Sequence, residues 1–202
     1  MADFKEAFDK TMGHEGGYVN DPNDAGGETY KGVARRYNPD WNGWGIIDQL
    51  KDAPNFPKNL DDSQPLQDAV KALYKQKYWN PFWGDEIPDQ DIAEELFDTG
   101  VNMGTGRAIK FLQQGLNLLN RNGKLYGDIV EDGDFGQNTF DALTAYLSGK
   151  GRAFDRQKDK PDLLLKIMNI LQGMHYINYM RKSPTQEKYA RGWLKRVKIS
   201  KS

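Results

Sequence analysis

The sequence predicts a mainly α fold (α+β) in which a small N-terminal β-hairpin region packs against a helical bundle. Apolar residues recur at helical spacing through most of the chain after Ser63. One early stretch, residues 18–33, instead alternates short β-prone pairs with turn formers. The chain has 202 residues, 38% of them hydrophobic, which is enough to bury a core.

The first helix is expected to begin near Phe4, because Phe4, Phe8 and Met12 recur at helical spacing, and to stop at Gly16-Gly17. Residues 37–62 are rich in Pro, Gly, Asn and Asp, and we expect a long irregular connection there. Apolar periodicity predicts later helices at about residues 63–74, 89–103, 105–119, 137–147 and 161–182.

Composition excludes several classes of protein. The chain has no cysteine, so disulfides, a thiol nucleophile and cysteine-ligated zinc are excluded. His14 and His175 lie far apart in the sequence, which disfavours a zinc hydrolase, and we expect no metal and no cofactor. No run approaches the ~20 apolar residues of a membrane span. The acidic, amphipathic start of the chain does not resemble a secretory signal peptide.

Glu15 is the first candidate catalytic residue. It follows Phe4 by eleven positions and Phe8 by seven, and at about 100° per residue both offsets are close to whole turns. We therefore expect Glu15 in the last turn of the first helix, on its apolar face. Burial and the negative end of the helix dipole both raise the pKa of a carboxyl group there, as a glycosidase general acid requires.

A glycosidase also needs a second group across the scissile bond. Asp24 lies in the turn-rich stretch that follows, and the hydroxyl of Thr29 is suited to holding a water molecule. Asp21 and Glu28 are alternatives to Asp24. A glutamate before Gly-Gly and an Asp-rich turn also occur for purely structural reasons, so spacing alone leaves the catalytic role open.

The run Glu15-Gly16-Gly17-Tyr18, with Asn20, Pro22, Asp24, Gly26-Gly27, Thr29 and Gly32, closely resembles the signature of glycoside hydrolase family 108. Members of that family are peptidoglycan muramidases of phage endolysins and of bacterial proteins labelled secretion activators. The resemblance implies a lysozyme-like fold and makes Glu15 the proton donor. It also implies cleavage of the β-1,4 bond between N-acetylmuramic acid and N-acetylglucosamine. Thr29 lies one residue nearer to Asp24 than in the similar phage-type lysozymes.

Later parts of the chain resemble the predicted peptidoglycan-binding region that accompanies this catalytic segment. The matching residues include Phe97-Asp98, Val101-Asn102, Leu112-Gln113, Asp132-Gly133 and Gly192-Trp193. The resemblance therefore implies a catalytic region over 1–95 and a helical binding region over 96–202, packed as one compact unit.

Several side chains are candidates for binding the glycan. Aromatic rings pack against sugar C–H groups, which nominates Tyr18 and Tyr30, together with Trp41 and Trp44. Asn20, which belongs to the family signature around Glu15, is a further candidate for binding the glycan. Asp98 and Asn102, four residues apart on one helical face, are candidates for hydrogen bonds to sugar substituents, and a capping or buried-network role is the alternative. Trp79, Trp83 and Trp193 are expected to fill the core or the junction between lobes, and neither histidine is given a catalytic role.

The expected function is that of a lysozyme-type N-acetylmuramidase with an inverting mechanism, acting as a monomer on peptidoglycan glycan strands. We expect no nucleic-acid partner, no stable membrane insertion, and release from the cytoplasm to the wall by a holin or other assisted export. The alternatives are a lytic transglycosylase acting on the same bond and a non-catalytic wall-binding or secretion-assisting protein. Residues 181–202 carry a charge of +7, and the remainder of the chain carries −8. This basic segment either attaches the protein to an anionic polymer or forms a solvated tail on the last helix.

Overall fold

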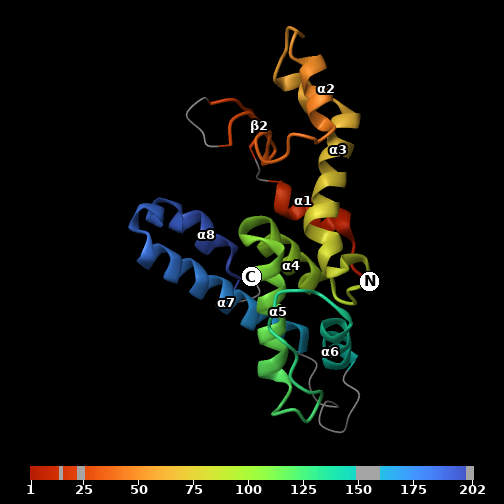
Figure 1. The fold of residues 1–202 in the computed structure, drawn as a ribbon, viewed down its shortest axis with the longest axis vertical. Coiled ribbons are helices and arrows are strands. Elements are labelled where there is room, and N and C mark those ends of the chain that lie inside the picture. Colours follow the sequence, from red (N-terminus) through yellow and green to blue (C-terminus); the bar gives the residue numbers. More distant parts are fainter. Residues whose placement is uncertain (14–15, 22–25, 149–159, 199–202) are drawn as a thin grey trace. The chain divides into compact units, whose positions relative to one another are not determined.

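The computed structural model describes residues 1–13, 16–21, 26–148 and 160–198 (Figure 1). The chain forms two compact units. One comprises Phe4–Asn80, and the other comprises Met1–Asp3 together with Pro81–Ser202. Glu15 and Asp24 lie outside the described residues, as does His14. Their predicted positions and roles stay predictions.

The Phe4–Asn80 unit begins with helix α1 (Phe4–Met12), which buries Ala7, Phe8 and Thr11. The Phe8 ring meets the Tyr74 ring edge-on, with 5.7 Å between centroids. The N–H of Gly13 still donates to the carbonyl of Asp9. The predicted first helix is therefore present, with its described part ending three residues before Glu15.

A three-stranded antiparallel sheet follows, made of β1 (Tyr18–Val19), β2 (Thr29–Tyr30) and β3 (Val33–Ala34) in the order β1-β2-β3. Tyr30 lies opposite Tyr18 on one side and Val33 on the other. Lys31 and Gly32 join β2 to β3 and both have positive φ angles, 44° and 75°, as a tight two-residue hairpin turn requires. The predicted hairpin region is confirmed.

The expected irregular connection at 37–62 is wrong in part, because it contains helix α2 (Gly43–Leu50) and a 3-10 turn, η1 (Lys58–Leu60). Helix α3 (Gln64–Tyr74) begins after Ser63, as predicted, and continues into a π-helical turn, η2 (Lys75–Trp79). The 3-10 turn η3 (Asn80–Phe82) follows directly. The core of this unit is apolar and includes Trp44, Ile47, Leu60, Leu66 and Trp79.

The second unit is a helical assembly whose first elements are η4 (Gly84–Glu86), α4 (Gln90–Met103) and α5 (Thr105–Leu119). Asp89 caps α4, since its Oδ1 accepts a hydrogen bond from the Ile92 N–H at 3.1 Å. Helices α4 and α5 lie side by side (Figure 1) and bury Leu96, Phe97 and Leu112. Helix α6 (Gln137–Ser148) packs against α5.

The long helix α7 (Lys160–Lys182) packs against α4 and α5. A 3-10 segment, η5 (Pro184–Tyr189), and helix α8 (Ala190–Arg196) then fold back onto α7 (Figure 1). The basic end of the chain is therefore folded through residue 196, and the interpretation as a solvated tail is wrong for this part. The predicted mainly α class with a small N-terminal sheet is confirmed. The sequence-based boundary at 95/96 falls inside α4 and stays a prediction.

Candidate functional site

The best-defined polar cluster of the Phe4–Asn80 unit surrounds Glu28, next to β2. Its side chain is only 11% exposed and accepts from three donors. Arg35 Nη1 lies 2.6 Å from Oε2, while Lys51 Nζ and the Tyr18 hydroxyl lie 2.8 and 2.9 Å from Oε1. Both oxygens are therefore occupied by groups from β1, from the segment after β3 and from the residue that follows α2.

Asp48 on α2 completes this cluster. Arg35 donates to both of its carboxylate oxygens, at 2.9 and 2.5 Å, and Lys51 approaches Oδ1 at 2.7 Å. Hydrogen bonds from Arg35 and then Lys51 hold the pKa of Asp48 well below its usual range. The Arg35 guanidinium also lies 5.1 Å from the centre of the Trp44 ring, a cation–π distance. The cluster ties the sheet to α2.

Glu28 is ionised in this setting. Burial alone raises the pKa of its carboxyl group, but hydrogen bonds from Lys51, Arg35 and Tyr18 outweigh burial and the pKa lies below its usual value. A carboxylate whose two oxygens are held by two cations is a poor proton donor and a weak base. Its contacts therefore support a structural role and weigh against Glu28 as the second catalytic group.

Tyr18 and Asn20 border the same cluster. The Tyr18 ring is half-buried and packs edge-on against Phe56, with 4.8 Å between centroids. Burial, and then the hydrogen bond to Glu28, raise the pKa of its hydroxyl. Asn20 is exposed.

Thr29 lies on β2, and its hydroxyl donates to the Gly27 carbonyl at 3.1 Å. The hydroxyl proton is therefore used internally, while the oxygen lone pairs can still accept a hydrogen bond from water. This geometry suits the predicted role of Thr29 in holding a water molecule, although the bond itself is also a common turn interaction.

Three aromatic residues proposed to line a glycan groove are buried instead. Tyr30 is 1% exposed, and its hydroxyl lies within hydrogen-bonding distance of the Leu60 carbonyl and of Asp61. Trp41 and Trp44 are 8% and 2% exposed, pack edge-on, and donate their indole N–H groups to backbone carbonyls. Their rings belong to the core, so the expectation that they offer a face to a sugar is wrong in this structure.

Asp98 and Asn102 lie one turn apart on α4, as predicted. Asp98 forms an ion pair with Arg196 of α8, with 2.6 Å between Oδ1 and Nη1. The side-chain amide of Asn102 donates to the Asp98 backbone carbonyl at 2.7 Å. Asp98 therefore joins α4 to α8, and Asn102 stays at the surface.

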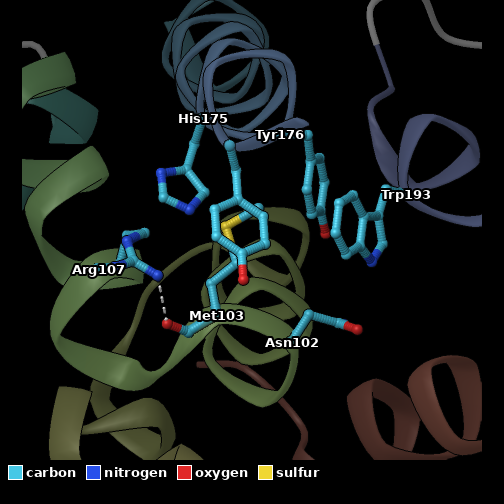
Figure 2. Close-up of a pocket in the computed structure, with 7 residues that line it drawn as sticks. Asn102, Met103, Arg107, His175, Tyr176 and Trp193 are labelled. Atoms are coloured by element: carbon cyan, nitrogen blue, oxygen red, sulfur yellow. Dashed lines mark hydrogen bonds between the residues drawn. The ribbon is translucent and has the colours of Figure 1, made fainter. Parts of the chain in front are cut away.

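Asn102 also lines a cavity of about 350 Å³ in the second unit (Figure 2). Its walls come from the end of α4, the start of α5, α7 and α8. The other lining residues include Arg107, His175, Tyr176, Tyr179 and Trp193. In Figure 2 Arg107 and Trp193 lie on opposite sides, with His175 above and Asn102 below.

The structure brings together two groups of residues that were not predicted from the sequence. The first group is the pair of cations that contact Glu28. These residues, Arg35 and Lys51, are brought together only by tertiary folding. Tyr176 and Tyr179 are three residues apart on a helix, a spacing that signals a shared face, but Trp193 joins them from another helix. Trp193 was expected in the core or at a junction between lobes; it is half-buried and lines the cavity.

Within the described ranges, no helix is both long and apolar enough to cross a membrane. In the same residues, no group of three or more His, Asp or Glu side chains is arranged to hold a metal ion.

In comparison with known proteins, the two halves of the chain match different family models. Residues 8–104 match the family described as Glycosyl hydrolase 108, and residues 107–198 match the Predicted Peptidoglycan domain. Among solved structures, the fold is similar to that of SagA from Brucella abortus, with a TM-score of 0.57 and 21% identity. The similarity covers 96% of this chain and 88% of that chain, and it shows a shared fold. No curated protein matches the chain.

Proposed function

The chain belongs to glycosyl hydrolase family 108 through residues 8–104 and carries a predicted peptidoglycan domain in residues 107–198; from this we propose that it is a lysozyme-type N-acetylmuramidase. The two family matches together support a glycoside hydrolase that acts on peptidoglycan. We propose that it cleaves the β-1,4 linkage between N-acetylmuramic acid and N-acetylglucosamine.

The observation that carries the proposal is the Glu15-Gly16-Gly17-Tyr18 motif inside the matched segment. Glu15 protonates the leaving glycosidic oxygen, which requires a carboxyl group that keeps its proton near neutral pH. The buried face of α1 supports this assignment, because Phe8 and Thr11 precede Glu15 by seven and four residues. The two glycines leave room for a substrate beside the acid.

Asp24, with Thr29, is the proposed water-activating pair of an inverting reaction. Two observations support it. The oxygens of Glu28 are already held by Tyr18, Arg35 and Lys51. The Thr29 oxygen can still accept a hydrogen bond from water. Asp21, an exposed residue after β1, is the alternative to Asp24.

The test is digestion of purified peptidoglycan by the wild-type protein and by Glu15→Gln, with products analysed by mass spectrometry. Loss of the general acid is expected to lower wall lysis by about 100-fold or more. Wild-type products should carry reducing N-acetylmuramic acid ends. Glu6→Gln is the matched control: Glu6 lies on α1 in an exposed ion pair with Lys10, at 3.0 Å, and should lyse walls normally.

Three results would contradict the proposal. Near wild-type lysis by folded Glu15→Gln removes Glu15 from the mechanism. Products ending in 1,6-anhydro sugars make the protein a lytic transglycosylase. Binding to insoluble wall with no release of soluble sugars makes it a non-catalytic binder.

A further inference from the structure

The cavity bounded by α4, α5, α7 and α8 presents aromatic surface on one side. Tyr176 and Trp193 are stacked, with 5.1 Å between ring centroids and 12° between planes (Figure 2). Tyr179 contacts the same indole at 5.9 Å. Tyr176 is only 4% exposed and covers one face of Trp193, whereas Tyr179 is 44% exposed. Tyr179 and the half-buried Trp193 therefore offer ring surface to a ligand.

Arg107 supplies the charge of the cavity. One of its guanidinium nitrogens donates to the Met103 carbonyl at 2.9 Å (Figure 2), which fixes the orientation of the side chain. Arg107 is exposed, and no ion pair joins it to an acid within the described part of the chain. The nearby Asp98 carboxylate is already paired with Arg196. The cavity is therefore suited to an anion.

His175 adds no charge at neutral pH. Burial, and then the positive charge of Arg107, hold the pKa of its imidazole below the usual value. Its ring lies parallel to that of Tyr179, with 6.3 Å between centroids. A carboxylate bound at Arg107 would offset the positive charge that lowers the pKa of His175. The pKa of His175 should therefore rise when an anion binds.

We propose that this cavity binds one N-acetylmuramyl unit of the wall, with the sugar ring against Tyr179 and Trp193 and the carboxylate of its substituent on Arg107. Aromatic faces pack on the C–H groups of a pyranose, and a guanidinium pairs with a carboxylate through two parallel hydrogen bonds. The exposed Asn102 amide is placed to bind a polar substituent of the sugar. The volume of about 350 Å³ lies within the range of small-ligand sites.

This inference rests on the proposed function for its substrate class, and it adds a second binding site outside the catalytic motif. The carboxylate has two sources in peptidoglycan: the lactyl group of an unsubstituted N-acetylmuramic acid, or the peptide attached to that group. The chemistry at Arg107 is the same for both.

The experiment measures binding of four probes to the full chain by calorimetry. The probes are N-acetylmuramic acid, N-acetylmuramyl-L-alanyl-D-isoglutamine, a neutral N-acetylglucosamine oligomer, and the stem peptide without sugar. At least one muramyl probe should bind about tenfold more tightly than the neutral oligomer and the free peptide. Whichever of the two muramyl probes binds more tightly identifies the source of the carboxylate. Neither muramyl probe contains a bond that the enzyme cleaves, so Glu15→Gln should bind them normally even if the proposed activity is absent.

Matched variants locate this binding. Tyr179→Ala and Arg107→Gln should each weaken binding of the muramyl probe by about tenfold. Tyr179→Phe keeps the ring and should bind as the wild type does.

NMR titration of His175 is the second readout, and the probe should raise its pKa in the wild type but not in Arg107→Gln. The proposal is overturned if no muramyl probe binds, or if the neutral oligomer or free peptide binds equally well. It is also overturned if Tyr179→Ala and Arg107→Gln bind as the wild type does, or if the pKa of His175 does not change in the bound protein.

Discussion

Glu95 on α4 is a carboxyl group in the interior of the second unit, only 7% exposed. Its Oε1 accepts a hydrogen bond from the Thr99 hydroxyl at 3.1 Å, and Thr99 in turn accepts from Gln172 of α7 at 2.8 Å. Burial, and then the charge of Asp98, raise the pKa of Glu95 to about 7; the hydrogen bond from Thr99 and the charge of Lys198 act in the opposite direction. The folded state therefore favours the protonated form of Glu95.

The raised pKa predicts a stability that falls with pH. Between the ordinary value of 4.5 and about 7, the folded protein binds the Glu95 proton more tightly than the unfolded chain does. The free energy of unfolding should therefore decrease as pH rises through this interval, by about 1–3 kcal/mol, and level off above it. Glu95→Gln stays neutral, can still accept from Thr99, and should remove this decrease. Urea unfolding at pH 5, 6, 7 and 8 measures it.

The control for that measurement is Glu94→Gln, which removes a less buried carboxylate from the same helix. This variant should keep the pH dependence of the wild type. A Glu95→Gln protein whose unfolding free energy still falls between pH 5 and 7 would show that other groups cause the effect.

Residue types and spacing predicted some individual contacts and missed others. The shared face of Asp98 and Asn102 follows from helical geometry alone. The burial of Tyr30, Trp41 and Trp44 could not be predicted, because it depends on partners such as Leu60 and Ala69 that are remote in the sequence. An aromatic residue in a turn-rich segment suits either a groove or a core, and only tertiary packing decides.

At the scale of elements, most helices could be predicted because their apolar periodicity is strong and their ends carry caps or glycines. One of two exceptions is α2, whose buried residues are Gly43, Trp44 and Ile47. Glycine contributes no apolar signal and has a low helix propensity, so two glycines within three residues concealed the helix. The other exception is α8, which is rich in charged residues, has no buried residue and packs on α7. Its sequence therefore lacks the apolar periodicity from which a helix is predicted.

The two glycines of α2 provide a matched pair for testing why this helix forms. A Cβ at Gly43 would lie 2.3 Å from atoms of the Trp41 ring, which is 8% exposed and cannot move aside freely. Gly43→Ala should therefore lower the free energy of unfolding by about 2 kcal/mol or more. Gly45 has no such neighbour within 4 Å, and Gly45→Ala should raise it by about 0.5–1 kcal/mol. Thermal and urea unfolding measure both.

The opposite ranking, with Gly45→Ala the more damaging, would contradict the packing of Trp41 against the start of α2. Equal destabilisation by both variants would do the same, because it would point to the backbone of α2 rather than to the Trp41 contact.

At the scale of the whole chain, the charge distribution is uneven although the net charge is only −1. The +7 segment from residue 181 onward includes η5 and α8, which pack on α7 and carry Trp193 into the cavity. Deleting residues 183–202 would therefore remove part of a folded unit as well as positive charge. Substituting exposed cations separates the two effects.

Lys182, Arg191 and Lys195 are exposed at the end of α7 and on α8, and none of them lines the cavity. Replacing all three by Gln should weaken binding to purified walls that carry anionic polymers by about tenfold at low salt, at roughly 0.5 kcal/mol for each charge. The difference should shrink as added salt shortens the screening length from about 10 Å at 0.1 M to about 3 Å at 1 M.

A second triple variant is the control, because it removes the same charge from another part of the chain. It replaces the exposed residues Lys110, Lys124 and Lys166 by Gln, and it should change binding less. Equal losses in the two triple variants would reduce the effect to net charge, and binding that is insensitive to salt in the wild type would exclude an electrostatic role for this end of the chain.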